Sequence, residues 1–182
     1  MTSAQTTLGL LSQALIAAWL INRVALRLPL CIRAVVVMGG AGFILLQFDN
    51  GLSAAMAMRA LWGDPSITTM QLLALSIAGR PASIGRTPAI ALAIIGIVFY
   101  VLALGLGDFD PYRIGFAAGP LVVVLAGAAA ATWWRGQPLY LWLLTVDLAA
   151  FGLGIMESNN LWDYLFDPLL VLAALVVAIR RR

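Results

Sequence analysis

Hydrophobic residues gather in seven long runs along this chain, separated by short connections rich in Arg, Asp, Gly and Pro. Several runs approach the roughly 20 residues that an α-helix needs to cross the hydrocarbon core of a bilayer. We therefore predict an all-α fold, a polytopic transmembrane bundle of about seven helices. The predicted helices cover residues 7–21, 33–48, 65–79, 88–106, 112–134, 138–156 and 161–179.

The composition of the chain agrees with a membrane protein. Apolar residues make up 63% of it and charged residues only 10%, whereas soluble domains carry about 25% charged residues. At 182 residues, we expect one transmembrane domain covering 1–182. All basic residues are Arg, and neither Lys nor His occurs. This bias is typical of a GC-rich bacterial genome, so we expect a multi-pass protein of the cell inner membrane.

Charged residues in the connections predict how the helices are oriented. Arginines occupy alternate connections, which face the cytoplasm according to the positive-inside rule. They are Arg23, Arg27 and Arg33, then Arg80 and Arg86, then Arg135, and finally residues 180–182. Acidic residues such as Asp49, Asp108 and Asp110 fall on the other side. We predict an N-terminus outside and a C-terminus in the cytoplasm, and we attribute the net charge of +3 to orientation, not to nucleic-acid binding.

Prolines mark the starts of several predicted helices. Proline suits the first helical position because its missing N–H has no helical partner there, and a capping side chain often precedes it. Thr87–Pro88, Asp110–Pro111 and Pro138 fit this rule. We therefore interpret Asp110 as a helix cap.

The seventh segment cannot begin at its proline. From Pro168 to the closing arginines is about a dozen residues, or roughly 18 Å of helix against roughly 30 Å of hydrocarbon. We predict that this helix begins at Leu161 with Asn160 as its cap, and that Pro168 interrupts it. Asp163 and Asp167, four positions apart, would then share one face of its outer half.

The third segment is also short, and a similar sequence introduces it. Residues 51–62 before it resemble a half-helix that either lies at the outer surface or re-enters the bilayer. Leu-Trp followed by Asp-Pro occurs at 61–65 and again at 161–168. The third and seventh segments would be the last helices of two triplets joined by a linker helix, a 3+1+3 repeat. In transporters built from repeats, such interrupted segments mark the substrate site.

Asp147 is the acidic residue that falls near the centre of a predicted helix. A carboxylate there costs roughly 2.5–3.5 kcal/mol on insertion scales, so such a residue normally faces the bundle interior and serves a function. We expect it to be protonated or hydrogen-bonded to neutral partners, because no Lys or His exists to pair with it. The alternative is an interhelical hydrogen bond worth about 0.6 kcal/mol that only holds helices together.

A functional Asp147 predicts a polar site in the outer half of the bundle. Depth counted from the outer surface places the side chains of Gln13 and Gln71 at a comparable level, and Asp167 closer to the surface. Acidic loop residues form an outer vestibule, which is favoured over a metal site because their spacing is not that of a calcium loop. The predicted substrate-binding residues are Asp147, Asp167, Asp163, Gln71, Gln13 and Glu157.

The residue inventory argues against most enzymes. Without His or Lys, and with Cys31 as the single cysteine, catalytic triads, zinc sites and Schiff bases are excluded. Carboxylate- or Mg²⁺-dependent chemistry is what remains. We therefore predict no catalytic residue, no cofactor and no bound metal.

Two function hypotheses lead, both placing the chain in a lipid bilayer, and a carboxylate- or Mg²⁺-dependent membrane enzyme is the third, less favoured one. The leading hypothesis is a small carrier or channel for a cation or polar solute, entered from the acidic outer vestibule. The alternative is a non-catalytic subunit or assembly factor of a larger membrane complex. Faces of small residues such as Gly115 and Gly119 are expected to pack within the bundle, and the alternative is contact with a second copy or a membrane-protein partner.

Overall fold

The computed structural model describes residues 3–49 and 51–180, and over these residues the protein is helical, without strands. The all-α prediction is thus confirmed, and each of the seven predicted segments contains a helix. The helices are α1 (Ser3–Val24), α2 (Leu30–Phe43), α3 (Ala54–Trp62), α4 (Ile67–Ile77), α5 (Arg86–Ala103), α6 (Gly119–Trp134), α7 (Pro138–Gly152), α8 (Leu161–Leu165) and α9 (Pro168–Ile179), with 3₁₀ helices η1 (Ala25–Arg27) and η2 (Pro111–Gly115).

The chain forms two compact units. The first contains the residues up to Pro65 together with Met70–Ala82, and the second contains Ser66–Thr69 together with the residues from Ser83 onward. Helix α4 therefore begins in the second unit and continues in the first. The prediction of a single domain over 1–182 stays a prediction.

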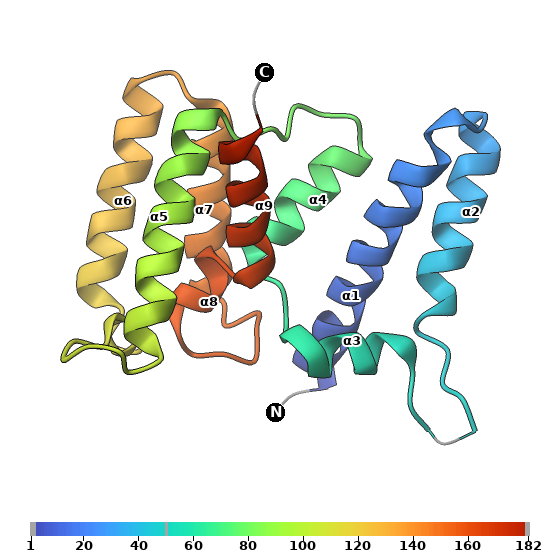
Figure 1. Cartoon of the computed structure of the whole chain (residues 1–182), viewed down its shortest axis with the longest axis horizontal. Coiled ribbons are helices and arrows are strands. Elements are labelled where there is room, and N and C mark those ends of the chain that lie inside the picture. Colours follow the sequence, from blue (N-terminus) through green and yellow to red (C-terminus); the bar gives the residue numbers. More distant parts are fainter. Residues whose placement is uncertain (1–2, 50, 181–182) are drawn as a thin grey trace. The chain divides into compact units, whose positions relative to one another are not determined.

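In the first unit, α1 packs against α2 and α3. Figure 1 shows α1 and α2 side by side, with α3 across the N-terminal end of α1. Gly40 of α2 lies against the side chain of Ile21, where an added Cβ would overlap it. The two helices can approach closely at this point because the glycine has no side chain.

In the second unit, α5 packs along α9 and α6 packs along α7, while α8 contacts α7 and η2 (Figure 1). The α5–α9 contact uses small residues. Ala89, Ala93 and Ala174 form a buried cluster between the two helices. A Cβ added at Gly96 would overlap the side chain of Val171. This close approach places α9, and the residues that precede it, firmly against α5.

The observed helix starts confirm some of those predicted from proline placement. Pro138 is the first residue of α7, and Pro168 is the first residue of α9 and separates it from α8. The prediction that Thr87 caps this helix is wrong, because α5 begins two residues before Pro88, at Arg86, and Gly85 is its N-cap residue. Pro88 still fits there, since the first turn of a helix needs no N–H from it.

The start of the fifth segment also differs from the prediction. The Asp110 carboxylate does cap a helix, accepting a hydrogen bond from the N–H of Tyr112, but the helix is η2. Helix α6 begins only at Gly119. Gly115 therefore lies in η2, and the two glycines do not share a face of one helix.

Two helical stretches in the described part of the chain are long and apolar enough to cross a membrane, Ala4–Arg27 and Arg86–Ala103. The remaining apolar helices are shorter. They are α2, α4, α6, α7 and α9. Helix α4, for example, has 11 residues, which corresponds to about 16 Å along its axis.

Candidate functional site

Asp147 lies on the buried face of α7, together with Leu143 and Ala150. Its side chain is 1% exposed. The hydroxyl of Thr68 donates a hydrogen bond to Asp147 Oδ2, with 2.5 Å between the two oxygens. Thr68 lies in the first turn of α4, in the same compact unit. The expected neutral partner of Asp147 is therefore a threonine hydroxyl.

Asp167 joins the start of α9 to the start of α4. Its Oδ1 accepts a hydrogen bond of 2.9 Å from the N–H of Leu170, which makes it the N-cap of α9. Its Oδ2 accepts bonds from the N–H of Ser66, at 2.7 Å, and from the hydroxyl of Thr69, at 2.5 Å. One buried carboxylate thus satisfies backbone donors of two chain segments that are 101 residues apart.

Ser66 precedes α4 and caps its first turn. Its hydroxyl oxygen accepts a hydrogen bond of 3.1 Å from the N–H of Thr69, the contact of a helix N-cap. Consecutive residues of an α-helix are about 100° apart around its axis, so Thr68 and Thr69 point in different directions. The structure therefore brings Asp147 and Asp167 to the same helix turn as two separate pairs. We call Asp147–Thr68 and Asp167–Thr69 the two carboxylate–threonine pairs.

Asp163 lies apart from these pairs. The prediction that it shares a helix face with Asp167 is wrong, because α8 ends at Leu165 and Phe166 is extended, with φ −155° and ψ 155°. The Asp163 carboxylate instead accepts hydrogen bonds from the hydroxyls of Tyr112, at 2.9 Å, and Ser158. Burial, and then the neighbouring Asp163 carboxylate, raise the pKa of Tyr112 to about 12.

Further contacts hold η2 against α8. Asn160 caps α8 as predicted, accepting a hydrogen bond of 3.0 Å from the N–H of Trp162. Its side-chain amide also donates to the carbonyl of Tyr112, at 2.9 Å. The side chain of Asn160 fills the place that a Cβ at Gly115 would take. The side chains of Tyr112, Ser158, Asn160, Trp162 and Asp163 together therefore fix α8 in position before the helix break.

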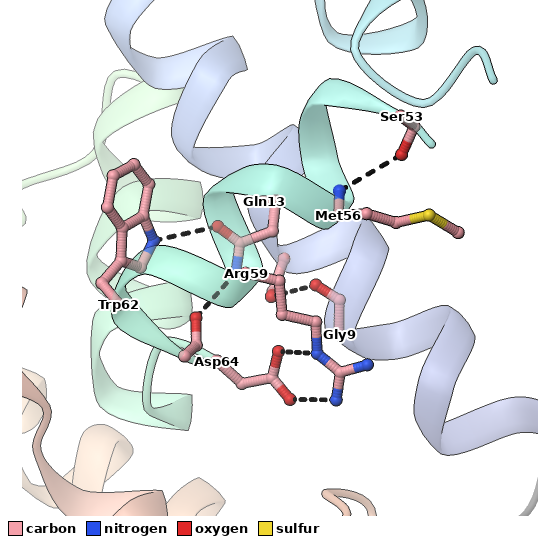
Figure 2. A network of polar contacts seen from close by, with 9 residues as sticks. Gly9, Gln13, Ser53, Met56, Arg59, Trp62 and Asp64 are labelled. Carbon is pink, nitrogen blue, oxygen red and sulfur yellow. Dashed lines mark hydrogen bonds and ion pairs between the residues drawn. The ribbon is translucent and has the colours of Figure 1, made fainter. Parts of the chain in front are cut away.

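Gln13 forms hydrogen bonds within the first unit. Its amide nitrogen donates to the carbonyl of Gly63, at 2.9 Å, and its Oε1 accepts from the indole N–H of Trp62, at 3.0 Å. Figure 2 shows these bonds at the C-terminal end of α3. Gln13 therefore provides a hydrogen-bond donor at the end of this helix, where backbone carbonyls lack helical partners. A role in substrate binding stays a prediction.

An ion pair lies beside Gln13 in the same unit (Figure 2). Arg59 donates two hydrogen bonds to the carboxylate of Asp64, at 2.7 and 2.8 Å. A Cβ at Gly9 would meet the two paired side chains at 2.8 Å. This aspartate of the 61–65 sequence thus has a different role from Asp167, although both precede a proline.

The predicted site residues are divided between the two units. Asp147, Asp163, Asp167 and the half-buried Glu157 belong to the second unit, and Gln13 and Gln71 to the first. Sequence reasoning missed the hydroxyl residues of α4. The available signal was three hydroxyl residues, Ser66, Thr68 and Thr69, close after a proline at the start of a short segment.

No known protein family, characterised protein or solved structure matches this chain significantly.

Proposed function

We propose that the chain is a multi-pass protein of a bacterial inner membrane, with its N-terminus outside and its C-terminus in the cytoplasm. Large apolar side chains on the helix surfaces support this proposal. Val24, Met38 and Trp134 are 86%, 75% and 91% exposed, respectively. A soluble protein would normally bury such side chains, whereas lipid accommodates them.

The short helices fit this proposal as parts of interrupted membrane segments. Helix α8 is followed by α9 after a break at Phe166, and α3 is followed by α4. Irregular backbone at membrane depth is tolerated where the protein itself satisfies its polar groups. Asp167 does this at the starts of α4 and α9, because it accepts hydrogen bonds from the N–H groups of Ser66 and Leu170.

We further propose that the protein is a small carrier or channel for a cation, with Asp147 as the binding residue. The observation that carries this proposal is the complete burial of Asp147 on an apolar helix, against a hydroxyl partner. An ionisable residue in such a position is expensive and usually marks an ion pathway or a proton relay. Its place beside a segment that begins after a proline agrees with the architecture of transporter sites.

Reconstitution into liposomes tests the proposed function. Cation entry would be followed with internal dyes for protons, sodium and potassium, under an imposed gradient of each ion. We expect flux through the unaltered protein and loss of flux in Asp147→Asn. Asp108→Asn is the comparison variant, because it makes the same chemical change in an exposed connection of the acidic vestibule, and we expect it to reduce flux much less than Asp147→Asn. Equal flux in all three proteins would contradict the role of Asp147.

A second candidate function is a non-catalytic subunit of a larger membrane complex. It is favoured by glycines whose Cβ positions open onto empty space, Gly39 and Gly42 on α2 and Gly127 on α6. Such positions allow another helix to approach closely. Purification from native membranes under mild conditions tests this candidate. A stoichiometric partner protein would support it, and a preparation containing only this chain would contradict it.

A further inference from the structure

We propose that the cation bound at Asp147 is a proton, and that Thr68 is the partner that holds the carboxyl group in both of its protonation states. This inference rests on the proposed function, since it names the ion for the same site. It arises from the different surroundings of the two buried carboxylates, Asp147 and Asp167.

The partners of Asp167 are donors that suit a carboxylate. The backbone N–H groups of Ser66 and Leu170 can only donate, so they engage one carboxyl oxygen each as an acceptor. The hydroxyl of Thr69 adds a third hydrogen bond. Asp167 also caps α9, and the N-terminal end of a helix attracts negative charge. Asp167 therefore serves as a structural acceptor at the starts of α4 and α9.

Asp147 has a different kind of partner. A threonine hydroxyl can donate to a carboxylate and can also accept from a carboxylic acid. When a proton binds to the Asp147 carboxylate, the new O–H can donate to Thr68 Oγ1, and the pair stays hydrogen-bonded. No other atom is exchanged, because the proton is taken from and returned to water. Asp147 is thus suited to bind and release a proton without a large structural change.

The elements around Asp147 carry few titratable groups. Helix α6, Ser66 and the first turn of α4 contain none. Helix α8 contributes Asp163 and Tyr164, and α9 is preceded by its cap, Asp167. Asp163 and Tyr164 have partners of their own near α8. The Asp163 carboxylate accepts a hydrogen bond from the hydroxyl of Tyr112, and the Tyr164 hydroxyl donates to the carbonyl of Ser158. Asp167 is engaged as described. Each of these groups is engaged elsewhere, and the hydroxyl of Thr68 is the partner that can hold Asp147 in either protonation state.

Infrared spectroscopy of the full-length protein in lipid vesicles tests this inference directly. A buried carboxylic acid gives a separate C=O stretching band, which disappears when the acid ionises. We expect this band to increase reversibly as the pH is lowered. It should be absent in Asp147→Asn and unchanged in Asp108→Asn. A band that titrates identically in Asp147→Asn would overturn the proposal.

Variants of the two threonines keep the test valid even if Asp147→Asn does not fold. Thr68→Val removes the hydroxyl while leaving Asp147 in place, so the C=O band should shift in frequency. Thr69→Val is the matched control, because it removes the neighbouring hydroxyl that binds Asp167, and it should leave the band of Asp147 where it was. An equal shift in both variants, or none in Thr68→Val, would contradict the assignment.

The probe ion separates protons from metal cations. Adding sodium chloride at constant pH should leave the band unchanged, and its loss on addition would show that Na⁺ competes for the site and would overturn the proposal. The result is also independent of transport. A titrating Asp147 band without any flux in liposomes would retain the proton site and reject the carrier. Flux that depends on Asp147, without a titrating band, would retain the carrier and reject the proton site.

Discussion

Thr68 in the first turn of α4 donates a 2.5 Å hydrogen bond to Asp147, although 79 residues separate them. The contact predicts that the hydroxyl matters for ion flux as much as for stability. A hydrogen bond to a charged group is worth about 1.5–3 kcal/mol, so we expect Thr68→Val to slow Asp147-dependent flux by at least about tenfold. Thr68→Ser keeps a hydroxyl and should restore flux in the same liposome assay. Normal flux in Thr68→Val would remove this role.

Asp167 should be needed for stability more than Asp147 is. Asp167→Ala removes the cap of α9, a loss of about 0.5–2 kcal/mol, and leaves the buried N–H of Ser66 without an acceptor, at about 1–3 kcal/mol. We expect unfolding in detergent to show a combined loss of about 2–4 kcal/mol. Asp147→Asn should lose clearly less. The reverse order would contradict the division of roles between the two carboxylates.

The two carboxylate–threonine pairs should behave as separate couplings. In a double-mutant cycle, Thr69→Val and Asp167→Asn remove the same hydrogen bond and should be strongly non-additive in unfolding free energy. Thr68→Val and Asp167→Asn have no shared hydrogen bond among those that define the pairs, so their effects should be closer to additive. Equal coupling in the two cycles would favour one shared site instead.

Gly96 of α5 should not tolerate a side chain. Gly96→Ala would press a Cβ into Val171 of α9, and overpacking of this kind costs about 1–3 kcal/mol in unfolding free energy. Adding Val171→Ala should recover much of the loss. Gly127→Ala in α6 is the matched control, because an added Cβ there meets no neighbouring atom. It should be neutral or slightly stabilising, by about 0.5–1 kcal/mol.

Tyr112 should ionise late in an alkaline titration. Its pKa lies near 12 rather than the ordinary 10.0, so the folded protein favours the neutral phenol. The resulting contribution to stability is fully present below pH 10 and is lost as the pH rises through about 12. The absorbance difference between the unaltered protein and Tyr112→Phe measures this ionisation. Asp163→Asn should move the midpoint of the Tyr112 transition to lower pH, and an unmoved midpoint would count against the influence of that carboxylate.

The predicted membrane orientation can be tested with single cysteines. In a Cys31→Ser background, Phe109→Cys lies in a connection predicted to be outside, and Ser83→Cys lies in one predicted to be cytoplasmic. An impermeant thiol reagent added to intact cells should label the first and spare the second. Both should react after the cells are opened, which controls for accessibility. The opposite labelling pattern would reverse the topology.

The interruption of the last segment was predicted correctly, because it follows from the number of residues after Pro168 and from the missing N–H of that proline. A helix from Pro168 alone is too short, and Asn160 is a good capping residue. Asp163 was misplaced because a continuous helix was assumed up to Asp167. The extended backbone of Phe166 depends on tertiary packing, including the ring of Phe99, whose centroid lies 4.8 Å away.

The carboxylate partners of the hydroxyl residues at the start of α4 could not be recognised from the sequence. Ser and Thr in an apolar helix often bond to nearby backbone groups, so their presence does not reveal a distant carboxylate partner. Gln13 illustrates a similar problem. Counting depth along the chain assumes parallel helices and cannot show that the end of α3 would need this side chain. Both features depend on which helices meet, which is set by packing over long sequence separations.

Asp167 limits how this sequence can vary. Because a single carboxylate serves backbone donors at Ser66 and Leu170, a replacement would have to suit two distant parts of the chain together. Changes in one segment cannot compensate for the other, so this position should be among the least tolerant in a saturation library. The two helix starts are therefore coupled through Asp167, and we expect sequence changes at the start of α4 and at the start of α9 to occur together.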